Sequence, residues 1–302
     1  MLPFVEKYRP KTLDDFVGNS EVIRSLKAFV STEQFPLSMI FYGDFGVGKT
    51  AAAKALARDY FVKKGLYSND AAFSDIVADP FLSPALFIDA SVENDVYTIK
   101  ERVRRFMQHL GLKDAKKIVI FDEADRLGYS AQGALRPLIE RYPNTLTIYT
   151  TNELDGIDGA IQSRAAGGIF HFKTPTPMEL EELLLNIASK EGLDTSRSDV
   201  KELAKAISTS AKSPREAVGL LGTEISVWRS EGRIRPQLVK AAVEEKKVFE
   251  QRGRQGLKSV EKGLANERQI AATKAWIKIY RKRGQEDKAK QIEEALKRMG
   301  CL

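Results

Sequence analysis

The sequence predicts an α/β fold with a parallel sheet, followed by two regions built only of helices. Two observations lead to this prediction. Short apolar runs with the composition of buried strands alternate with helix-like stretches over residues 37–172. Beyond the segment 174–177, which reads Thr-Pro-Thr-Pro, only helical patterns remain. We therefore expect a sheet domain at 1–175, a small helical lid-like domain at 176–234 and an all-α basic domain at 235–302.

Five apolar runs are the expected strands of the sheet. They are rich in β-branched and aromatic residues, as strands of a buried parallel sheet are. Helical patterns lie between them, which is typical of βαβ units. In chain order the runs are 37–42, 85–89, 117–122, 145–150 and 168–172.

Two amphipathic helices are expected beside this sheet, at 20–32 and at about 97–107. Ser20 is the expected N-cap of the first helix, because serine favours that position and apolar residues follow it at helical spacing. The expected apolar faces are Val22, Ile23, Leu26, Phe29 and Val30 in the first helix and Tyr97, Ile99, Val103, Phe106 and Met107 in the second.

The stretch 62–84 does not follow the alternating pattern. It contains Gly65, an Asn-Asp pair at 69–70 and two prolines, all of which favour turns over regular structure. We interpret it as an insertion or a mobile connection, and its role stays open.

A glycine-rich loop follows the first expected strand. Residues 43–50 read G-x-x-x-x-G-K-T and lead into an alanine-rich helix at 50–60. In this pattern the glycines aim backbone N–H groups at phosphates, the lysine reaches the β- and γ-phosphates, and the threonine hydroxyl ligates Mg²⁺. The predicted nucleotide contacts are Gly43, Gly46, Val47, Gly48, Lys49, Thr50 and Ala51, and Thr50 is also a predicted metal ligand.

Two carboxylates stand at the end of the strand expected at 117–122. Asp122 ends this apolar run and Glu123 follows it. Because the carboxyl ends of parallel strands meet at one edge of the sheet, both residues should lie near the glycine-rich loop. Asp122 would hold Mg²⁺ and Glu123 would activate the attacking water, so the implied reaction is hydrolysis of a nucleoside triphosphate.

Three further side chains are candidates for the same site. Asn152 follows the strand expected at 145–150 and could contact the γ-phosphate or the water, although asparagine is also a common turn residue. Arg164 and Arg215 could each neutralise developing phosphate charge, or each could be an ordinary surface arginine.

The rarity of cysteine and histidine excludes several kinds of site. Cys301 is the only cysteine, so no intramolecular disulfide or cysteine-based metal site is expected, and only His109 and His171 could serve a histidine-based one. No apolar run is long enough to span a membrane, and the N-terminus lacks the apolar core of a signal peptide. We therefore expect an intracellular protein, cytoplasmic or nuclear, with no membrane partner.

The positive charge belongs to the C-terminal part of the chain. Residues 235–302 hold 18 Lys or Arg against 9 Asp or Glu, a net charge of +9, whereas the first 234 residues have a net charge of −2. Such a charge favours a polyanionic partner, nucleic acid first. The alternative is a set of solvated helix faces, and the same choice applies to the cations of the 97–107 helix.

These motifs together resemble those of one family. The chain is similar to the small subunit of replication factor C and to related phage and archaeal sliding-clamp loaders, within the AAA+ ATPases. The likeness covers about residues 3–230. It rests on 6–10 (Glu-Lys-Tyr-Arg-Pro), 43–50, 122–125 (Asp-Glu-Ala-Asp), 131–136 (Ala-Gln-Gly-Ala-Leu-Arg), 151–153 (Thr-Asn-Glu), 163–164 (Ser-Arg) and 214–215 (Pro-Arg).

The resemblance implies ATP and Mg²⁺ as cofactors and assigns roles to single residues. Asn152 matches sensor 1, and Arg215 matches the sensor 2 arginine of the helical lid, which touches the γ-phosphate of its own subunit. Arg164 matches the arginine finger, which enters the site of the neighbouring subunit, so that catalysis would require an oligomer. The implied adenine pocket consists of Tyr8, Arg9, Pro10 and Val17.

The resemblance also implies the partners. These are a sliding clamp, primer–template DNA and further clamp-loader subunits, in a homo- or hetero-oligomer that we expect to be pentameric. In this family ATP-bound subunits form a spiral that opens the clamp and grips DNA, and hydrolysis triggers release. The positions that match the family's DNA contacts are Lys100, Arg104, Arg105 and Arg136.

The chain departs from the family pattern at three places. Ala165 replaces the cysteine of the usual Ser-Arg-Cys, and Pro137 follows Arg136 where a second arginine is usual. A proline inside a helix costs about 3 kcal/mol unless the helix kinks or begins there. The C-terminal segment is also short and strongly basic compared with the helical collar through which these loaders assemble.

Two other functions share some of these features. A different DNA-acting AAA+ motor, for branch migration or fork remodelling, or a regulatory switch would use the same active site. A scaffold subunit with a structural nucleotide is the third hypothesis, but it would need neither Glu123 nor Arg164.

Overall fold

The computed structural model describes residues 3–77, 79, 83–93, 95–108 and 114–237, together with positions 274, 277, 278, 281, 290, 292–294, 296 and 297. It divides into two units, Met1–Ile234 and Arg235–Leu302. His109, Cys301 and most of the region for which an all-α basic domain is predicted lie outside the described residues.

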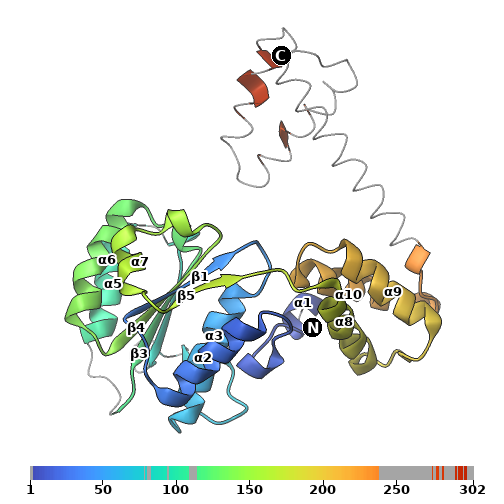
Figure 1. The fold of residues 1–302 in the computed structure, drawn as a ribbon, viewed down its shortest axis with the longest axis horizontal. Coiled ribbons are helices and arrows are strands. Elements are labelled where there is room, and N and C mark those ends of the chain that lie inside the picture. Colours follow the sequence, from blue (N-terminus) through green and yellow to red (C-terminus); the bar gives the residue numbers. More distant parts are fainter. Residues whose placement is uncertain are drawn as a thin grey trace. The chain divides into compact units, whose positions relative to one another are not determined.

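The first unit is built on a parallel sheet of five strands (Figure 1). The strand order is β2 (Ala85–Asp89), β3 (Lys117–Asp122), β4 (Thr145–Thr151), β1 (Ser38–Gly43) and β5 (Ile169–Phe172). All four pairs are parallel. The predicted α/β class and the five predicted strands are therefore confirmed, with shifts of one residue at some ends.

Helices cover both faces of this sheet (Figure 1). Helices α2 (Ser20–Thr32) and α3 (Lys49–Lys63) pack on one face, and α5 (Val96–Gln108), α6 (Tyr129–Arg141) and α7 (Gly159–Arg164) pack on the other. Successive strand residues point to opposite faces, so Met39 and Phe41 join the first layer while Ile40 joins the second. Both faces are buried, which explains why the strands read as continuous apolar runs.

Helix α2 begins where the sequence predicts but has a different cap. Asn19 occupies the N-cap position in place of Ser20, with φ of 51° in the left-handed region. Asparagine tolerates this conformation better than most residues. Its side chain bonds to the backbone of Lys173 in both directions, donating from Nδ2 to the carbonyl oxygen and accepting the amide at Oδ1, each at 2.8 Å. The predicted cap is wrong because this long-range contact determines where the helix begins.

Two features of the second helical layer differ from expectation. Tyr97 was expected on the apolar face of α5 but is 74% exposed, because it lies on the first turn, beyond the buried Ile99 and Val103. Pro137 lies inside α6, which neither begins nor ends there. The helix therefore tolerates the loss of one backbone hydrogen bond.

Most of the irregular stretch after α3 is held against that helix. Arg58 donates from Nε to the Ala71 carbonyl at 3.2 Å and from Nη2 to the Asn69 carbonyl. A short helix, α4 (Phe73–Ile76), follows, and Ile76 is fully buried. These contacts argue against a mobile connection over 62–77, and an insertion stays a prediction. Residues 78 and 80–82 lie outside the described residues.

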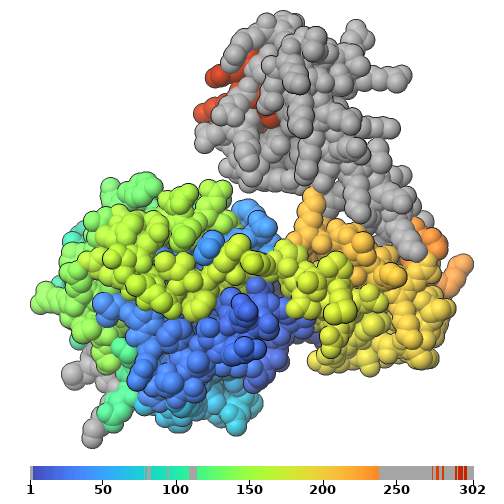
Figure 2. Space-filling model, in the orientation of Figure 1, coloured from blue at the N-terminus to red at the C-terminus, as the bar shows by residue number. Residues whose placement is uncertain are grey.

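Three helices follow the sheet and form a lid: α8 (Pro177–Lys190), α9 (Ser198–Ser210) and α10 (Pro214–Glu231). Two begin at prolines after hydroxyl caps, since Thr176 accepts from the Glu179 amide and Ser213 accepts from the Glu216 amide. The N-terminal helix α1 (Phe4–Lys7) lies beside α10 (Figure 1). The dark-blue N-terminal residues meet the sheet domain and the lid at their junction (Figure 2).

Three short 3₁₀ helices complete the first unit: η1 (Leu13–Asp15), η2 (Ala124–Arg126) and η3 (Leu154–Gly156). In the second unit the described positions from Lys274 to Lys297 are all helical, and Ile277, Ile292 and Leu296 are buried there. No helix in the described part of the chain is long and apolar enough to cross a membrane.

Candidate active site

The site forms at the carboxyl edge of the sheet, where β1 ends in the glycine-rich loop. Gly43, Gly46 and Gly48 have φ of 142°, 77° and 105°, values that favour glycine. A Cβ on Gly43 would lie against the Phe172 carbonyl oxygen, and one on Gly46 would lie 2.7 Å from Ser213 Oγ. The loop therefore needs glycine both for its backbone conformation and for its close contacts with β5 and the lid.

Lys49 is the first residue of α3 and is 8% exposed. Its Nζ donates to the carbonyl oxygens of Gly43 (2.8 Å) and Asp44 (2.7 Å) and to Asn152 Oδ1 (3.1 Å). Burial lowers the pKa of Lys49 to about 8, although the nearby carboxylate of Asp122 acts in the opposite direction. The structure thus brings predicted residues from β1 and β4 together around one ammonium group.

Thr50 and Asp122 meet across the same edge. The Thr50 hydroxyl donates to Asp122 Oδ1 at 2.6 Å, and the Thr150 hydroxyl donates to the same oxygen. Mg²⁺ prefers hard oxygen ligands and is usually bound through one or two protein groups with substrate phosphates. The hydroxyl and carboxylate of this pair fit such an ion. Thr150 was not predicted, although its place at the end of an apolar strand next to β3 could have indicated it.

Glu123 follows Asp122 with φ of 51°, an uncommon conformation for glutamate. Its amide donates to the Thr150 hydroxyl at 3.3 Å, and its carboxylate lies 3.8 Å from Arg126 Nε. The left-handed backbone turns the chain away from the strand and leaves this carboxylate accessible. A general base needs such access to water.

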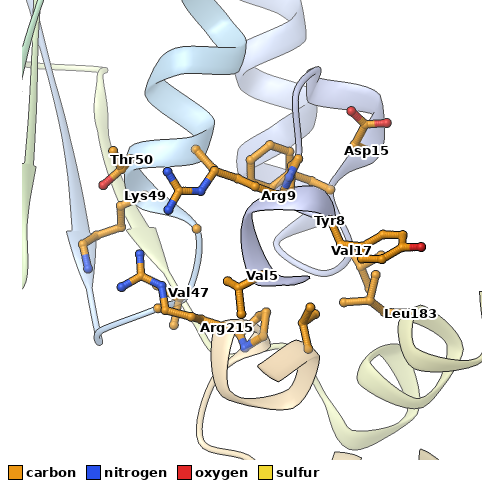
Figure 3. A pocket seen from close by; sticks show the side chains of 17 residues that line it. Val5, Tyr8, Arg9, Asp15, Val17, Val47, Lys49, Thr50, Leu183 and Arg215 are labelled. Carbon is orange, nitrogen blue, oxygen red and sulfur yellow. The ribbon is translucent and has the colours of Figure 1, made fainter. Parts of the chain in front are cut away.

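A pocket lies between the glycine-rich loop, the N-terminal segment and the lid (Figure 3). The guanidinium groups of Arg9 and Arg215 point toward its Lys49 and Thr50 side (Figure 3). Of the predicted nucleotide contacts only Gly43 does not line it; those that do are Tyr8, Arg9, Pro10, Val17, Gly46, Val47, Gly48, Lys49, Thr50, Ala51 and Arg215.

The remaining wall of this pocket was not predicted. It consists of Val5, Asp15, Phe16, Leu183, Pro214 and Val218. Val5 adjoins the motif at 6–10, so proximity could have suggested it. Leu183 and Val218 come from α8 and α10, whose approach to the loop depends on how the lid packs, and no sequence signal indicates that.

Arg215 comes from the first turn of α10 and enters the pocket from the lid. Its backbone N–H donates to the Gly46 carbonyl at 3.4 Å, which joins the lid to the glycine-rich loop. Among the described residues its guanidinium makes no ion pair. A guanidinium held in this way is available for an anion in the pocket.

Arg164 ends α7 and does not line this pocket. Its Nη1 donates to the Ala160 carbonyl at 2.6 Å, and its Nη2 pairs with the Glu140 carboxylate on α6. The structure therefore holds Arg164 between α6 and α7, whereas the predicted catalytic residues Lys49 and Arg215 line the pocket.

The residues that match DNA contacts lie on α5 and α6. Lys100 and Arg105 are exposed on α5, while Arg104 pairs with Glu101 at 2.6 Å. Arg136 pairs with Asp158, the N-cap of α7. Two of these four cations, Lys100 and Arg105, take part in none of the described ion pairs. They are therefore accessible to a phosphate backbone.

Sequence comparison places these motifs among known proteins. The model of the ATPase family associated with various cellular activities (AAA) matches residues 39–171. A replication factor C small subunit of Archaeoglobus fulgidus is 36% identical over 203 residues, which are 66% of this chain and 57% of that protein. One of Methanococcus vannielii is 32% identical over 256 residues, which are 80% of this chain and 73% of that protein.

Solved structures give a similar fold. The RuvB Holliday junction branch migration motor of Thermotoga maritima has a TM-score of 0.59 and 18% identity, covering 84% of this chain and 79% of that chain. A mutant of the same protein has a TM-score of 0.60, covering 91% of this chain and 81% of that chain. At this level of identity the likeness establishes the fold alone.

Proposed function

Because the chain belongs to the replication factor C small-subunit family of AAA ATPases, we propose that this ATPase drives a sliding-clamp loader. In that role it opens a clamp and places it on primer–template DNA. The observation that carries the proposal is the pocket in which Lys49, Thr50 and the lid residue Arg215 surround one space, with Asp122 bonded to Thr50.

The phosphate end of the site would work through charge and position. Lys49 exchanges its carbonyl partners for the β- and γ-phosphates, and Arg215 contributes a second positive charge from the lid. Thr50 and Asp122 would hold Mg²⁺, which would supply positive charge to offset that of the phosphates. Phosphoryl transfer depends mainly on such positioning and electrostatic stabilisation.

The hydrolytic step would belong to the residues that follow β3 and β4. Glu123 takes a proton from the attacking water, and Asn152 orients that water or the γ-phosphate. The adenine would lie at the other end of the pocket, against Tyr8, Pro10 and Val17. Lid closure would then bring the two ends of the site together around one nucleotide.

Arg164 would complete the site of a neighbouring subunit. Its absence from the lining of its own pocket and its place at the end of α7 support a role in trans. The oligomer would be a homo- or hetero-pentamer, as the family resemblance implies. Hydrolysis would therefore require assembly.

DNA would contact the open cations Lys100 and Arg105, with Arg104 and Arg136 exchanging their carboxylate partners for phosphates. Arg136 would also connect DNA to α7, because its partner Asp158 caps the helix that carries Arg164.

The decisive experiment measures ATPase activity of the purified protein alone, with primed DNA, with a candidate clamp, with both, and with a branched DNA junction. We expect DNA and clamp together to stimulate more than the sum of their separate effects. Stimulation by a branched junction without any response to a clamp would contradict clamp loading and favour a branch-migration or remodelling motor.

A further inference from the structure

Glu191 is a buried carboxylate at the C-terminal end of α8, outside the nucleotide pocket. Its side chain is 2% exposed and accepts hydrogen bonds from three donors. Lys7 Nζ donates at 2.5 Å, and the Tyr8 hydroxyl and Arg229 Nη2 donate to the two carboxylate oxygens. The lid thus holds the end of α1 through a charged network that also includes α10.

This carboxylate remains ionised in spite of its burial. Burial raises the pKa of Glu191, but the bonds from Lys7 and Tyr8 and the charges of Lys7 and Arg229 hold that pKa below its usual range. A buried carboxylate is costly unless its partners are all in place. The buried carboxylate of the lid is therefore stable only while its donors are bonded to it.

Apolar contacts fasten the same segment to α10. A Cβ on Gly222 would lie 2.6 Å from the Phe4 ring, so the ring packs directly on the helix backbone. A Cβ on Gly219 would lie 3.7 Å from Val5 Cγ2. The rings of Phe4 and Tyr8 are 5.0 Å apart, so the ring of Tyr8 packs against that of Phe4. Residues 4–8 are therefore packed as part of the lid.

After residues 4–8, the N-terminal segment contacts the sheet domain in place of the lid. The Leu13 amide donates to Asp59 Oδ2 on α3 at 2.8 Å, which joins the chain to the sheet domain. Asp15 accepts from the amides of Lys11 and Thr12. Only residues 9–12 lie between the lid contacts and the α3 contact, and a short connection of this kind is where a hinge would act.

We propose that Glu191 is a positioning residue that locks residues 4–8 to the lid, so that the base side of the nucleotide pocket moves with the lid. Val5 and Tyr8 form this side together with Leu183 and Val218 of the lid. Opening of the lid would then release the base and withdraw Arg215 from the phosphates in one motion. The inference rests on nucleotide binding in the proposed function, and clamp loading is not needed for it.

The first test compares Glu191→Gln and Tyr8→Phe with a matched lid variant, Glu182→Gln, whose carboxylate is exposed on α8. Loss of one bond to a charged group should weaken ATP binding roughly tenfold or more. We expect KM and the Kd for a fluorescent ATP analogue to rise by this factor for both test variants, with kcat within about twofold of wild type.

Tyr8→Phe keeps the ring and removes only the hydroxyl, so it reports on the network even if Glu191→Gln folds poorly. Unchanged ATP affinity in Tyr8→Phe, or an equal loss in Glu182→Gln, would overturn the proposal. A purely structural role would lower the unfolding midpoint and leave KM unchanged. That result would overturn it as well.

The second test asks whether the segment and the lid separate during turnover. Cysteines at Phe4 and Gly222, in a Cys301→Ser background, should form a disulfide after a small shift apart, since a Cβ on Gly222 lies 2.9 Å from that of Phe4, somewhat closer than the about 3.5–4.5 Å of disulfides. We expect the oxidised and reduced forms of this variant to have the same ATP affinity and turnover. A loss of turnover on oxidation that a reductant reverses would show that the two must separate, and failure to crosslink would contradict the packing.

Failure of the proposed function would give a different result from failure of this inference. A protein that binds ATP through this lock but ignores clamp and DNA would refute clamp loading and leave the inference intact.

Discussion

Lys49 has the most perturbed charge in the pocket. Its ammonium is bonded to two backbone carbonyls and one amide oxygen, with no carboxylate in direct contact among the described residues. Burial is the main cause of the pKa of about 8. A phosphate near this group would favour its charged form and raise its pKa again.

ATP affinity should therefore fall as the pH rises above about 8. Free Lys49 loses its proton through its pKa of about 8, and binding must then restore that proton, which makes binding about tenfold weaker at pH 9 than at pH 7. Lys49→Arg, whose charge does not titrate in this range, is the control and should show no such slope. Titration with a fluorescent ATP analogue between pH 7 and 9 measures the effect, and a flat profile for the wild type would contradict it.

The proposed role of Arg164 in a neighbouring subunit predicts that two inactive variants can complement each other. Arg164→Ala should abolish hydrolysis and largely spare ATP binding, because this residue does not line its own pocket. Glu123→Gln should also be inactive, through loss of the base. A mixture of the two variants should regain activity, since an intact pocket from one chain can meet an intact Arg164 from the other.

Steady-state ATPase assays of each variant and of the mixture measure this complementation. If Arg164 acted within its own chain, every pocket in the mixture would lack one residue and no activity would return. Loss of ATP binding in Arg164→Ala would contradict the assignment directly.

At the scale of the elements, contacts between distant segments determine where some helices begin. Asn19 fixes the start of α2 by bonding the backbone of Lys173, which follows β5. Glu140 and Asp158 tie α6 to both ends of α7 through Arg164 and Arg136. These contacts connect helices and strands that are far apart in the sequence. A local sequence pattern predicts each element separately and does not reveal such contacts.

Asn19→Ala should lower the free energy of unfolding by about 3–4 kcal/mol. It removes two hydrogen bonds, each worth about 1 kcal/mol, and places alanine in a left-handed conformation that costs about 1–2 kcal/mol. Asn19→Gly loses the same bonds without that strain, so it should be less destabilising than alanine here. Urea denaturation of the two variants measures the difference, and equal losses would contradict the strain argument.

At the scale of the whole molecule, the pocket and the basic region belong to different units. All residues that line the pocket lie within Met1–Ile234. Residues 235–302 carry the net charge of +9. The pocket and the excess of positive charge thus lie in different parts of the chain.

Removal of residues 236–302 should leave ATP affinity unchanged and impair assembly, DNA affinity or both. The loss in DNA affinity should be largest at low salt, because contacts to phosphates release counterions. Sedimentation and DNA-binding titrations at two salt concentrations measure the outcome. Unchanged sedimentation together with unchanged DNA binding would refute a role for this region in either process.

Much of this architecture follows from local patterns. The strands are predictable because a parallel sheet with both faces covered needs continuous apolar runs, as at 117–122. The meeting of Thr50 with Asp122 is predictable because all strands of a parallel sheet end at the same edge. The roles of Glu123, Asn152, Arg164 and Arg215 stay predictions, which the variants above address.

The sequence by itself thus determines the sheet, the glycine-rich loop and the order of the chemical groups along the chain, since each depends on neighbours only a few residues away. Only the tertiary structure decides how the lid closes the pocket. Glu191 lies 184 residues from Lys7 and 183 from Tyr8, and no periodicity or motif connects positions so far apart. Their contact arises from packing of α1 on α10, where Phe4 fits the surface that Gly222 leaves open.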